Sequence, residues 1–84
     1  MENSVLIVCV DPDRLAAYQR LLSPSFQVVV PAASFADATE ALGASPQRVL
    51  VCETRLREFH GLHLALWTRV HYVDVRTVLI GEPD

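Results

Sequence analysis

The chain has 84 residues, of which 51% are hydrophobic and 20% are charged, with a formal net charge of −3. This length accommodates one small domain over residues 1–84, and the apolar content excludes an intrinsically disordered chain. Seven arginines, no lysine and ten acidic residues exclude a basic face of the kind that binds nucleic acid.

The apolar segments are too short to cross a bilayer, and the N-terminus lacks the basic start of a secretory signal. Cys9 and Cys52 lie inside apolar runs, which is typical of buried thiols in a reducing cytoplasm. We therefore expect a cytoplasmic protein that contacts neither membranes nor nucleic acid. Because so short a chain buries little of its surface, its high apolar content indicates either a fragment or a partner that covers the surplus.

Four segments rich in β-branched residues are expected to form strands: residues 4–10, 26–30, 48–53 and 76–81. Each segment is continuously apolar rather than alternating. This pattern is typical of strands in a parallel sheet that is covered on both faces.

The first segment with helical spacing lies between the first two strands. It begins at Asp11 and Pro12, because an acceptor followed by proline is typical of a helix start, and it ends at Ser23 and Pro24. Four apolar residues are expected on its inner face: Leu15, Tyr18, Leu21 and Leu22.

Two further helices follow the second and third strands. The earlier one is expected to begin at Ser34 and to end at Gly43. The later one follows Gly61 and offers five residues to cover the sheet: Leu62, Leu64, Leu66, Trp67 and Val70. The order β-α-β-α-β-α-β predicts a three-layer α/β fold around a right-handed, wound parallel sheet.

Ligands bind such sheets outside the carboxyl ends of the strands. Asp11, Glu53 and Glu82 follow three of the predicted strands, so we expect them at one edge of the sheet. One interpretation is a site for a hard cation such as Mg²⁺, which prefers carboxylate oxygens. We favour the other, in which these are solvated carboxylates and Asp11 caps the first helix.

His60 and His63 lie three residues apart, with Glu58 nearby, and this spacing resembles part of a zinc site. Two ring nitrogens and one carboxylate do not complete a tetrahedral site, so we expect no metal. His71 falls near the end of the third helix, where a positive charge favours the helix dipole.

Cys9 is interpreted as a small apolar filler rather than a redox centre, because no adjacent His or Lys would lower its pKa. Cys52 is expected to face away from Glu53, since strand side chains alternate, and a Cys9–Cys52 bridge is therefore not expected. Trp67 is expected to be a core residue or an interface anchor.

The segment Val5-Leu6-Ile7-Val8-Cys9-Val10-Asp11-Pro12 resembles the first strand and acidic turn of the response-regulator receiver domains of two-component signalling. Val49-Leu50-Val51-Cys52-Glu53-Thr54-Arg55-Leu56, followed by Gly61-Leu62-His63-Leu64, is similar to the third strand, phosphoacceptor loop and next helix start of that family. Thr77-Val78-Leu79-Ile80 is similar to the fourth strand. The resemblance implies a flavodoxin-like sheet of strand order 2-1-3-4, truncated after its fourth strand.

Receivers accept a phosphoryl group on an aspartate, assisted by acids that hold Mg²⁺, by a hydroxyl group and by a lysine. The resemblance places Glu53 at the phosphoacceptor position and Glu82 at the hydroxyl position. It places Cys9, Val10 and Asp11 in the acidic pocket, and it leaves the lysine without an equivalent, since that residue follows the fifth strand and the sequence ends at Asp84. The resemblance therefore implies a degenerate pseudo-receiver that is not an enzyme and has no catalytic residue, metal or cofactor.

Two interpretations of Glu53 remain open. Either Glu53 imitates a phosphorylated aspartate, or the site has lost its signalling role. We favour the second interpretation, because the lysine and the hydroxyl group that would respond to its charge are missing. Its longer side chain also displaces the attacking oxygen by more than about 1 Å, which costs roughly a hundredfold in rate. Arg55 and Arg57 either pair with Glu53 or face water.

The predicted function is a phosphorylation-independent interaction module of two-component signalling or transcription regulation. If the fifth strand is absent, the fourth is an apolar edge, which proteins rarely leave bare. We expect a homodimer or larger oligomer, by edge pairing or exchange of elements, or contact with another signalling protein. The interface candidates are Thr77, Val78, Leu79, Ile80 and Trp67. The alternative is the N-terminal part of a longer response regulator whose remainder supplies the fifth strand, the lysine and an output domain.

Overall fold

A parallel sheet of four strands forms the middle layer of the protein in a computed structural model, which describes residues 3–45, 47–56 and 59–81. The strands lie in the order β2-β1-β3-β6, and each pair of neighbours is parallel. Their bounds are β1 (Ser4–Val8), β2 (Val28–Ala32), β3 (Val49–Glu53) and β6 (Arg76–Ile80). The predicted strand order is confirmed.

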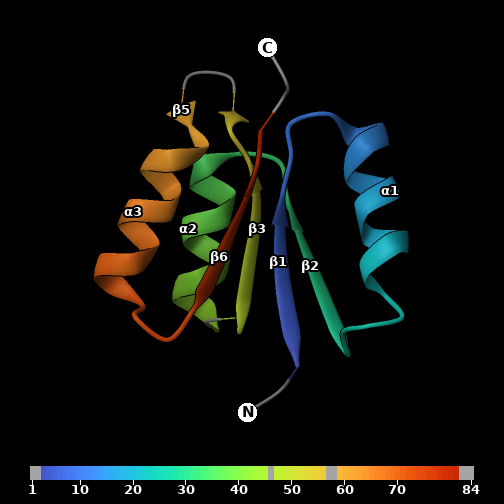
Figure 1. The fold of residues 1–84 in the computed structure, drawn as a ribbon, viewed down its shortest axis with the longest axis horizontal. Helices are drawn as coiled ribbons and strands as arrows, with labels where there is room; N and C mark the ends of the chain where they lie inside the picture. The colour runs from blue at the N-terminus through green and yellow to red at the C-terminus, as the bar shows by residue number, and fades with distance from the viewer. Residues whose placement is uncertain (1–2, 46, 57–58, 82–84) are drawn as a thin grey trace.

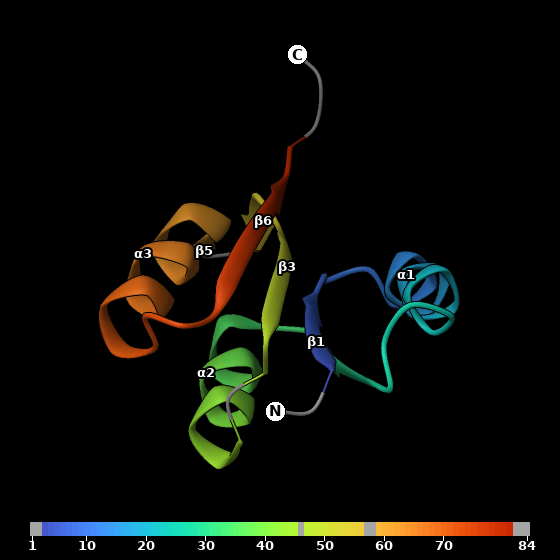
Figure 2. The same ribbon diagram turned by 60° about the horizontal axis from the view of Figure 1, so that its bottom comes forward.

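The helices cover both faces of this sheet (Figure 1). α1 (Pro12–Leu22) lies on one face, and α2 (Phe35–Ala44) and α3 (Gly61–His71) lie on the other, as the rotated view shows (Figure 2). The predicted three-layer α/β architecture is therefore confirmed. Within the part of the chain that the structure describes, none of the helices has the length and apolarity needed to cross a bilayer.

Two helices begin where the sequence predicts. The Oδ1 atom of Asp11 accepts hydrogen bonds from the N–H groups of Asp13 and Arg14, at 2.9 and 3.2 Å. The hydroxyl oxygen of Ser34 accepts one from the N–H of Asp37 at 3.0 Å. Each side chain satisfies donors at a helix start that have no acceptor within the helix, and this fixes where α1 and α2 begin.

The main core lies between the sheet and the layer of α2 and α3. All five residues of β1 are buried, because this strand has a neighbour on each side and helices over both faces. Full burial of one large aliphatic side chain is worth about 1.5–3 kcal/mol. The buried residues of this cluster are Leu6, Val8, Ala32, Ala38, Leu42, Leu50, Cys52 and Leu64.

The second strand is displaced from its predicted position. The sequence predicts residues 26–30, whereas β2 covers Val28–Ala32 and includes Pro31. Val28 is the first paired residue because it lies opposite Ser4, where β1 begins. Pro31 is tolerated because β2 is an edge strand, so its missing N–H interrupts no ladder between two neighbours.

The expectation that every strand is covered on both faces agrees with the inner strands, since β1 is buried throughout and β3 has no exposed residue, but it is wrong for the edge strands. In β6, Arg76, Val78 and Leu79 are exposed, and in β2 Val28 and Pro31 are exposed. Both strands lie at the edges of the described sheet, where the covering helices reach only part of each side chain.

Some apolar residues assigned to the inner faces of helices are exposed instead. Leu21 is 73% exposed, and no residue of α1 is fully buried. Viewed along the axis of α1, Leu15 and Leu22 point in nearly the same direction. Leu21 points roughly 60° away from Tyr18, on the side that faces solvent. On α3, Leu64 is buried while three other residues are exposed, namely Leu62, Leu66 and Val70, because the outer half of α3 extends past the edge strand.

A short antiparallel hairpin joins β3 to α3 and is absent from the sequence prediction. It consists of β4 (Arg55–Leu56) and β5 (Phe59–His60). Strands of two residues are too short to show periodicity, so a pattern of apolar residues does not reveal them.

Replacement of Leu42 by alanine tests the position of the core. We expect Leu42→Ala to lower the free energy of unfolding by about 2–5 kcal/mol, because it leaves a cavity among fully buried side chains. The exposed leucine of α1 is the matched control, and Leu21→Ala should change stability by less than about 0.5 kcal/mol. Urea titration followed by circular dichroism measures both, and equal losses would contradict this assignment.

Candidate functional site

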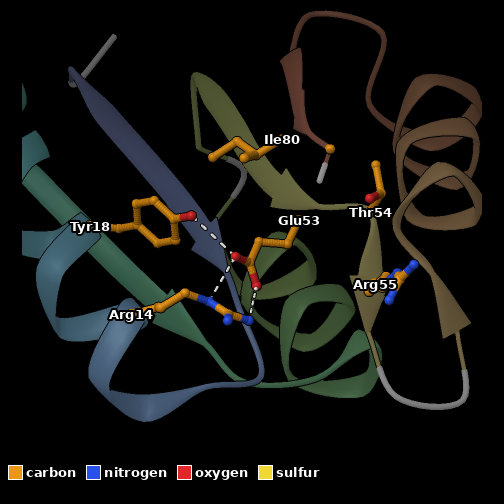
Figure 3. Close-up of a pocket in the computed structure, with 7 residues that line it drawn as sticks. Arg14, Tyr18, Glu53, Thr54, Arg55 and Ile80 are labelled. Carbon is orange, nitrogen blue, oxygen red and sulfur yellow. Dashed lines mark hydrogen bonds and ion pairs between the residues drawn. The ribbon is translucent and has the colours of Figure 1, made fainter. Parts of the chain in front are cut away.

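Glu53 is the last residue of β3 and lies at the carboxyl end of the sheet. Side chains alternate along a strand, and Cys52 points into the core beside α2 and α3. Glu53 therefore points to the opposite face, which α1 covers. Arg14 and Tyr18 lie four residues apart on α1, so they share one face of the helix, and both point toward Glu53 (Figure 3).

Both carboxylate oxygens of Glu53 are engaged. The guanidinium group of Arg14 donates from Nη2 to Oε1 at 3.1 Å, and its Nε lies 3.1 Å from Oε2. The hydroxyl of Tyr18 donates to Oε2 at 3.1 Å, and the Cys9 thiol donates to Oε1 at 3.0 Å. We call these four residues the Glu53 cluster. A bidentate pair with further donors fixes both the position and the orientation of the carboxylate.

The contacts of Glu53 favour its charged form. Its side chain is only 12% exposed, and this burial alone would raise the pKa of the carboxyl group. The hydrogen bonds from Cys9, Arg14 and Tyr18 outweigh burial, so the pKa of Glu53 lies below its ordinary value. The same pairing raises the pKa of the Arg14 guanidinium, mainly through the hydrogen bond to Glu53. The pair is therefore ionised throughout the neutral range.

Cys9 is a buried thiol rather than a reactive thiolate. Burial raises its pKa first, and the hydrogen bond to the Glu53 carboxylate raises it further. Its sequence interpretation as an apolar filler is incomplete, because the thiol also donates to Glu53. Cys52 lies on the opposite face, as predicted, where burial raises its pKa to about 12. Both cysteines are free.

The residues at the acidic-pocket positions do not fit a magnesium ion. Cys9 offers sulfur, whereas Mg²⁺ takes oxygen ligands. Val10 packs against the core, and the Oδ1 atom of Asp11 is occupied as the cap of α1, as predicted. The oxygens of Glu53 already accept hydrogen bonds. Among the residues that the structure describes, no group of three or more His, Cys, Asp or Glu side chains is arranged to hold a metal.

Several sequence candidates lie outside the described residues or away from the cluster. Glu82, assigned to the hydroxyl position, is outside the described residues, as are Arg57 and Glu58. His63 is exposed on α3. Arg55 lies on the rim of a pocket of about 280 Å³ beside the cluster (Figure 3). This pocket is lined by Arg14, Tyr18, Glu53, Thr54, Arg55, Ile80 and Gly81.

Trp67 lies on α3 and is half-buried against the core. Its ring meets Phe35 of α2 edge to face, with 6.4 Å between centroids, and stacks on His71 at 4.3 Å. The Nδ1 atom of His71 lies 2.8 Å from the carbonyl oxygen of Trp67, which holds the imidazole at the end of α3. These contacts make Trp67 a packing residue between α2 and α3.

Gly61 permits a close approach between the start of α3 and the end of β3. Its N–H donates to the carbonyl oxygen of Thr54 at 2.7 Å. A Cβ atom at this position would overlap the backbone carbonyl of Glu53. Gly61 therefore has a steric role beside the cluster.

The fold is that of receiver domains. No protein-family model and no curated protein sequence matches the chain. Among solved structures, the signal receiver domain of an HD domain-containing protein from Pseudomonas fluorescens Pf-5 is similar with a TM-score of 0.91 and 21% identity, over 100% of this chain and 68% of that one. The MaeR response regulator bound to beryllium trifluoride has a TM-score of 0.87 and 21% identity, over 98% and 69%. The response regulator TrrA from Thermotoga maritima has a TM-score of 0.85 and 16% identity, over 96% and 70%.

Gly61→Ala tests the close approach at the end of β3. The added methyl group forces backbone apart, so we expect a loss of about 1–3 kcal/mol in the free energy of unfolding. Gly43→Ala is the matched control, because a Cβ there meets only the Tyr72 hydroxyl at 3.9 Å within an exposed stretch of α2. We expect that variant to be neutral or stabilised by up to about 1 kcal/mol. Equal destabilisation in a urea titration would exclude the steric role.

The lowered pKa of Glu53 predicts a pH dependence of stability. As the pH falls, the unfolded chain takes up this proton first, near the ordinary value of 4.5, and the folded chain takes it up later. The contribution of Glu53 is thus complete above that value and is lost as the pH drops through the folded pKa. In urea titrations between neutral pH and pH 3, we expect Glu53→Gln to have a lower free energy of unfolding than the parent chain at neutral pH. We also expect that free energy to fall less on acidification than it does in the parent chain.

The control for this titration is Glu40→Gln, which changes an exposed glutamate of α2. It should leave the pH dependence close to that of the parent chain. If Glu40→Gln and Glu53→Gln flatten the profile equally, the Glu53 cluster does not stabilise the folded state through its charge.

Proposed function

We propose that this chain is a non-catalytic, receiver-like signalling module that acts by protein contact without accepting a phosphoryl group. The observation that carries the proposal is the engagement of both Glu53 oxygens by Arg14, Tyr18 and Cys9. A carboxylate that attacks phosphorus needs an accessible oxygen in line with the leaving group. Here each oxygen accepts two donors, so attack would require breaking the cluster.

The charge arrangement around Glu53 also opposes phosphoryl transfer. A phosphoryl group arrives with negative charge that metal ions or lysine normally neutralise. Cys9 and Val10 offer no side-chain oxygen as a ligand for magnesium. Arg14 is ion-paired with Glu53, so its positive charge already neutralises that carboxylate.

The geometry gives no support to Glu53 as a phosphate mimic. A mimic acts by presenting charge to groups that move between two states. The Glu53 carboxylate instead turns toward α1, where it is ion-paired and 12% exposed. We infer that the cluster holds one arrangement of α1 against β3, which suits a constitutive binding module.

The receiver fold supports a place for this module in two-component signalling, where such domains act through contacts with other signalling proteins. Its partner is then a signalling protein or a second copy of the chain. Transcription regulation is one output that such contacts serve, and it requires no basic face on this domain.

A phosphorylation assay tests the non-catalytic assignment. We expect incubation with acetyl phosphate and Mg²⁺ to leave the intact mass of the chain unchanged, because both oxygens of Glu53 are engaged and Cys9 and Val10 offer no side-chain oxygen to magnesium. Glu53→Asp is the informative second variant. It restores the usual phosphoacceptor residue, yet it should also remain unmodified because Cys9 and Val10 still replace the metal-binding acids.

Addition of one phosphoryl mass to Glu53 in the parent chain would overturn the proposal. Phosphorylation of the Glu53→Asp variant but not of the parent chain would show that the surrounding residues still support phosphoryl transfer. The glutamate side chain would then be what prevents it. A receiver domain with an intact aspartate serves as the positive control for the phosphodonor.

A further inference from the structure

Two carboxylates from different strands contact the same guanidinium group at the carboxyl edge of the sheet. Asp11 follows β1, and Glu53 is the last residue of β3. The Nη2 and Nε atoms of Arg14 each lie 3.1 Å from an oxygen of Glu53, and its Nη1 lies 3.9 Å from Oδ2 of Asp11 (Figure 3). Arg14 therefore bridges two of the three carboxylates that the sequence predicts at this edge. The third, Glu82, lies outside the described residues.

The start of α1 fixes where this guanidinium group lies. Oδ1 of Asp11 accepts a hydrogen bond from the backbone N–H of Arg14 at 3.2 Å, so the cap that begins the helix also fixes the backbone of Arg14. The cap uses Oδ1, and the other oxygen of the same carboxylate, Oδ2, is the one that lies near Nη1. Asp11 can therefore cap the helix and pair with Arg14 at the same time.

A positive charge is needed at this position. The Glu53 carboxylate is largely withdrawn from water, and an ionised group in such surroundings is costly unless a counter-ion and hydrogen bonds compensate it. Asp11 brings a second negative charge to the same guanidinium group, and two carboxylates repel each other unless a cation is shared between them. The edge of the sheet thus has the electrostatic requirement of a cation site.

The contacts of Glu53 suit a guanidinium group better than a metal ion. The Cys9 thiol and the Tyr18 hydroxyl both present hydrogens to the carboxylate. A metal ion needs the reverse arrangement, in which lone pairs from several oxygens converge on one point, at about 2.0–2.1 Å for Mg²⁺. A guanidinium group needs only a carboxylate with both oxygens in reach of its parallel N–H groups, and Glu53 offers this to Arg14.

We propose that the guanidinium group of Arg14 takes the place of a bound cation, so that α1 stays fixed to β3 whatever the Mg²⁺ concentration. The proposal rests on the proposed function, because it explains how a module without phosphoryl transfer keeps one arrangement. A bound ion stabilises a fold in proportion to its occupancy, whereas a tethered guanidinium group is always present. The position that Arg14 fills is therefore a latent site for a small cation, which opens when this side chain is removed.

Arg14→Ala tests the bridge in urea titrations of the chain. The variant leaves the Glu53 carboxylate without its counter-ion, so we expect the folding equilibrium constant to fall about tenfold or more. Arg20→Ala is the matched control, because it removes an exposed arginine from the last turn of the same helix. It should change the folding equilibrium constant by no more than about twofold.

Added cations test whether Arg14 fills a cation site. The titrations are repeated with methylguanidinium chloride or MgCl₂, each compared with NaCl at the same ionic strength. The parent chain and Arg20→Ala should respond alike, without a gain from MgCl₂ over NaCl. Relative to them, Arg14→Ala should regain stability with at least one of the two cations, by about tenfold in the folding constant at ten times the dissociation constant. The double variant Arg14→Ala/Glu53→Gln should not respond, because it lacks the carboxylate that binds the cation.

Three outcomes would overturn the proposal: a parent chain that MgCl₂ stabilises more than NaCl does, an Arg14→Ala variant as stable as Arg20→Ala, or an Arg14→Ala variant that neither cation restores. Circular dichroism without urea shows whether each variant is folded. If Arg14→Ala is unfolded without urea, its refolding by either cation gives the same readout. The mass assay for phosphorylation tests the proposed function separately, so either idea can fail alone.

Discussion

The carboxylate of Glu53 ties α1 to the end of β3 through Arg14 and Tyr18. This contact matters for the whole layer because α1 buries none of its residues fully and so contributes little to the apolar core. Because the inner face of α1 is only partly buried, a directional contact is needed to fix the position of the helix. The bidentate pair of Arg14 and Glu53 supplies that contact. Glu53, which the resemblance assigns to the phosphoacceptor position, thus holds two layers of the fold together.

Much of the fold could be predicted from the sequence, because its strands and helix caps are local signals. The apolar run of β1, the caps Asp11 and Ser34, and the order of elements led to the correct strand order and layers. The errors lie where tertiary position decides. β2 shifted by two residues because pairing with Ser4 sets its start, and Leu21 turned outward because its angle on α1 lies beside the buried stripe.

The site was only partly predictable. The strand pattern placed Glu53 at the carboxyl end of the sheet, and the resemblance assigned Cys9 and Val10, which have no side-chain oxygen for magnesium, to the acidic pocket. It did not reveal Arg14 or Tyr18, because their contacts with Glu53 span 39 and 35 residues and depend on where α1 lies over the sheet. Their spacing of four residues was a usable signal, but Tyr18 was assigned to the apolar face, and nothing local shows that its hydroxyl reaches an acid.

Pro31 interrupts the row of backbone donors along one edge of the sheet. It lies in β2, whose outer side has no neighbouring strand in the described sheet. A proline cannot donate a hydrogen bond to a further strand, so a chain that pairs along this edge finds one donor missing in a strand of only five residues. The β2 edge is therefore a poor template for the open-ended strand addition that leads to fibrils.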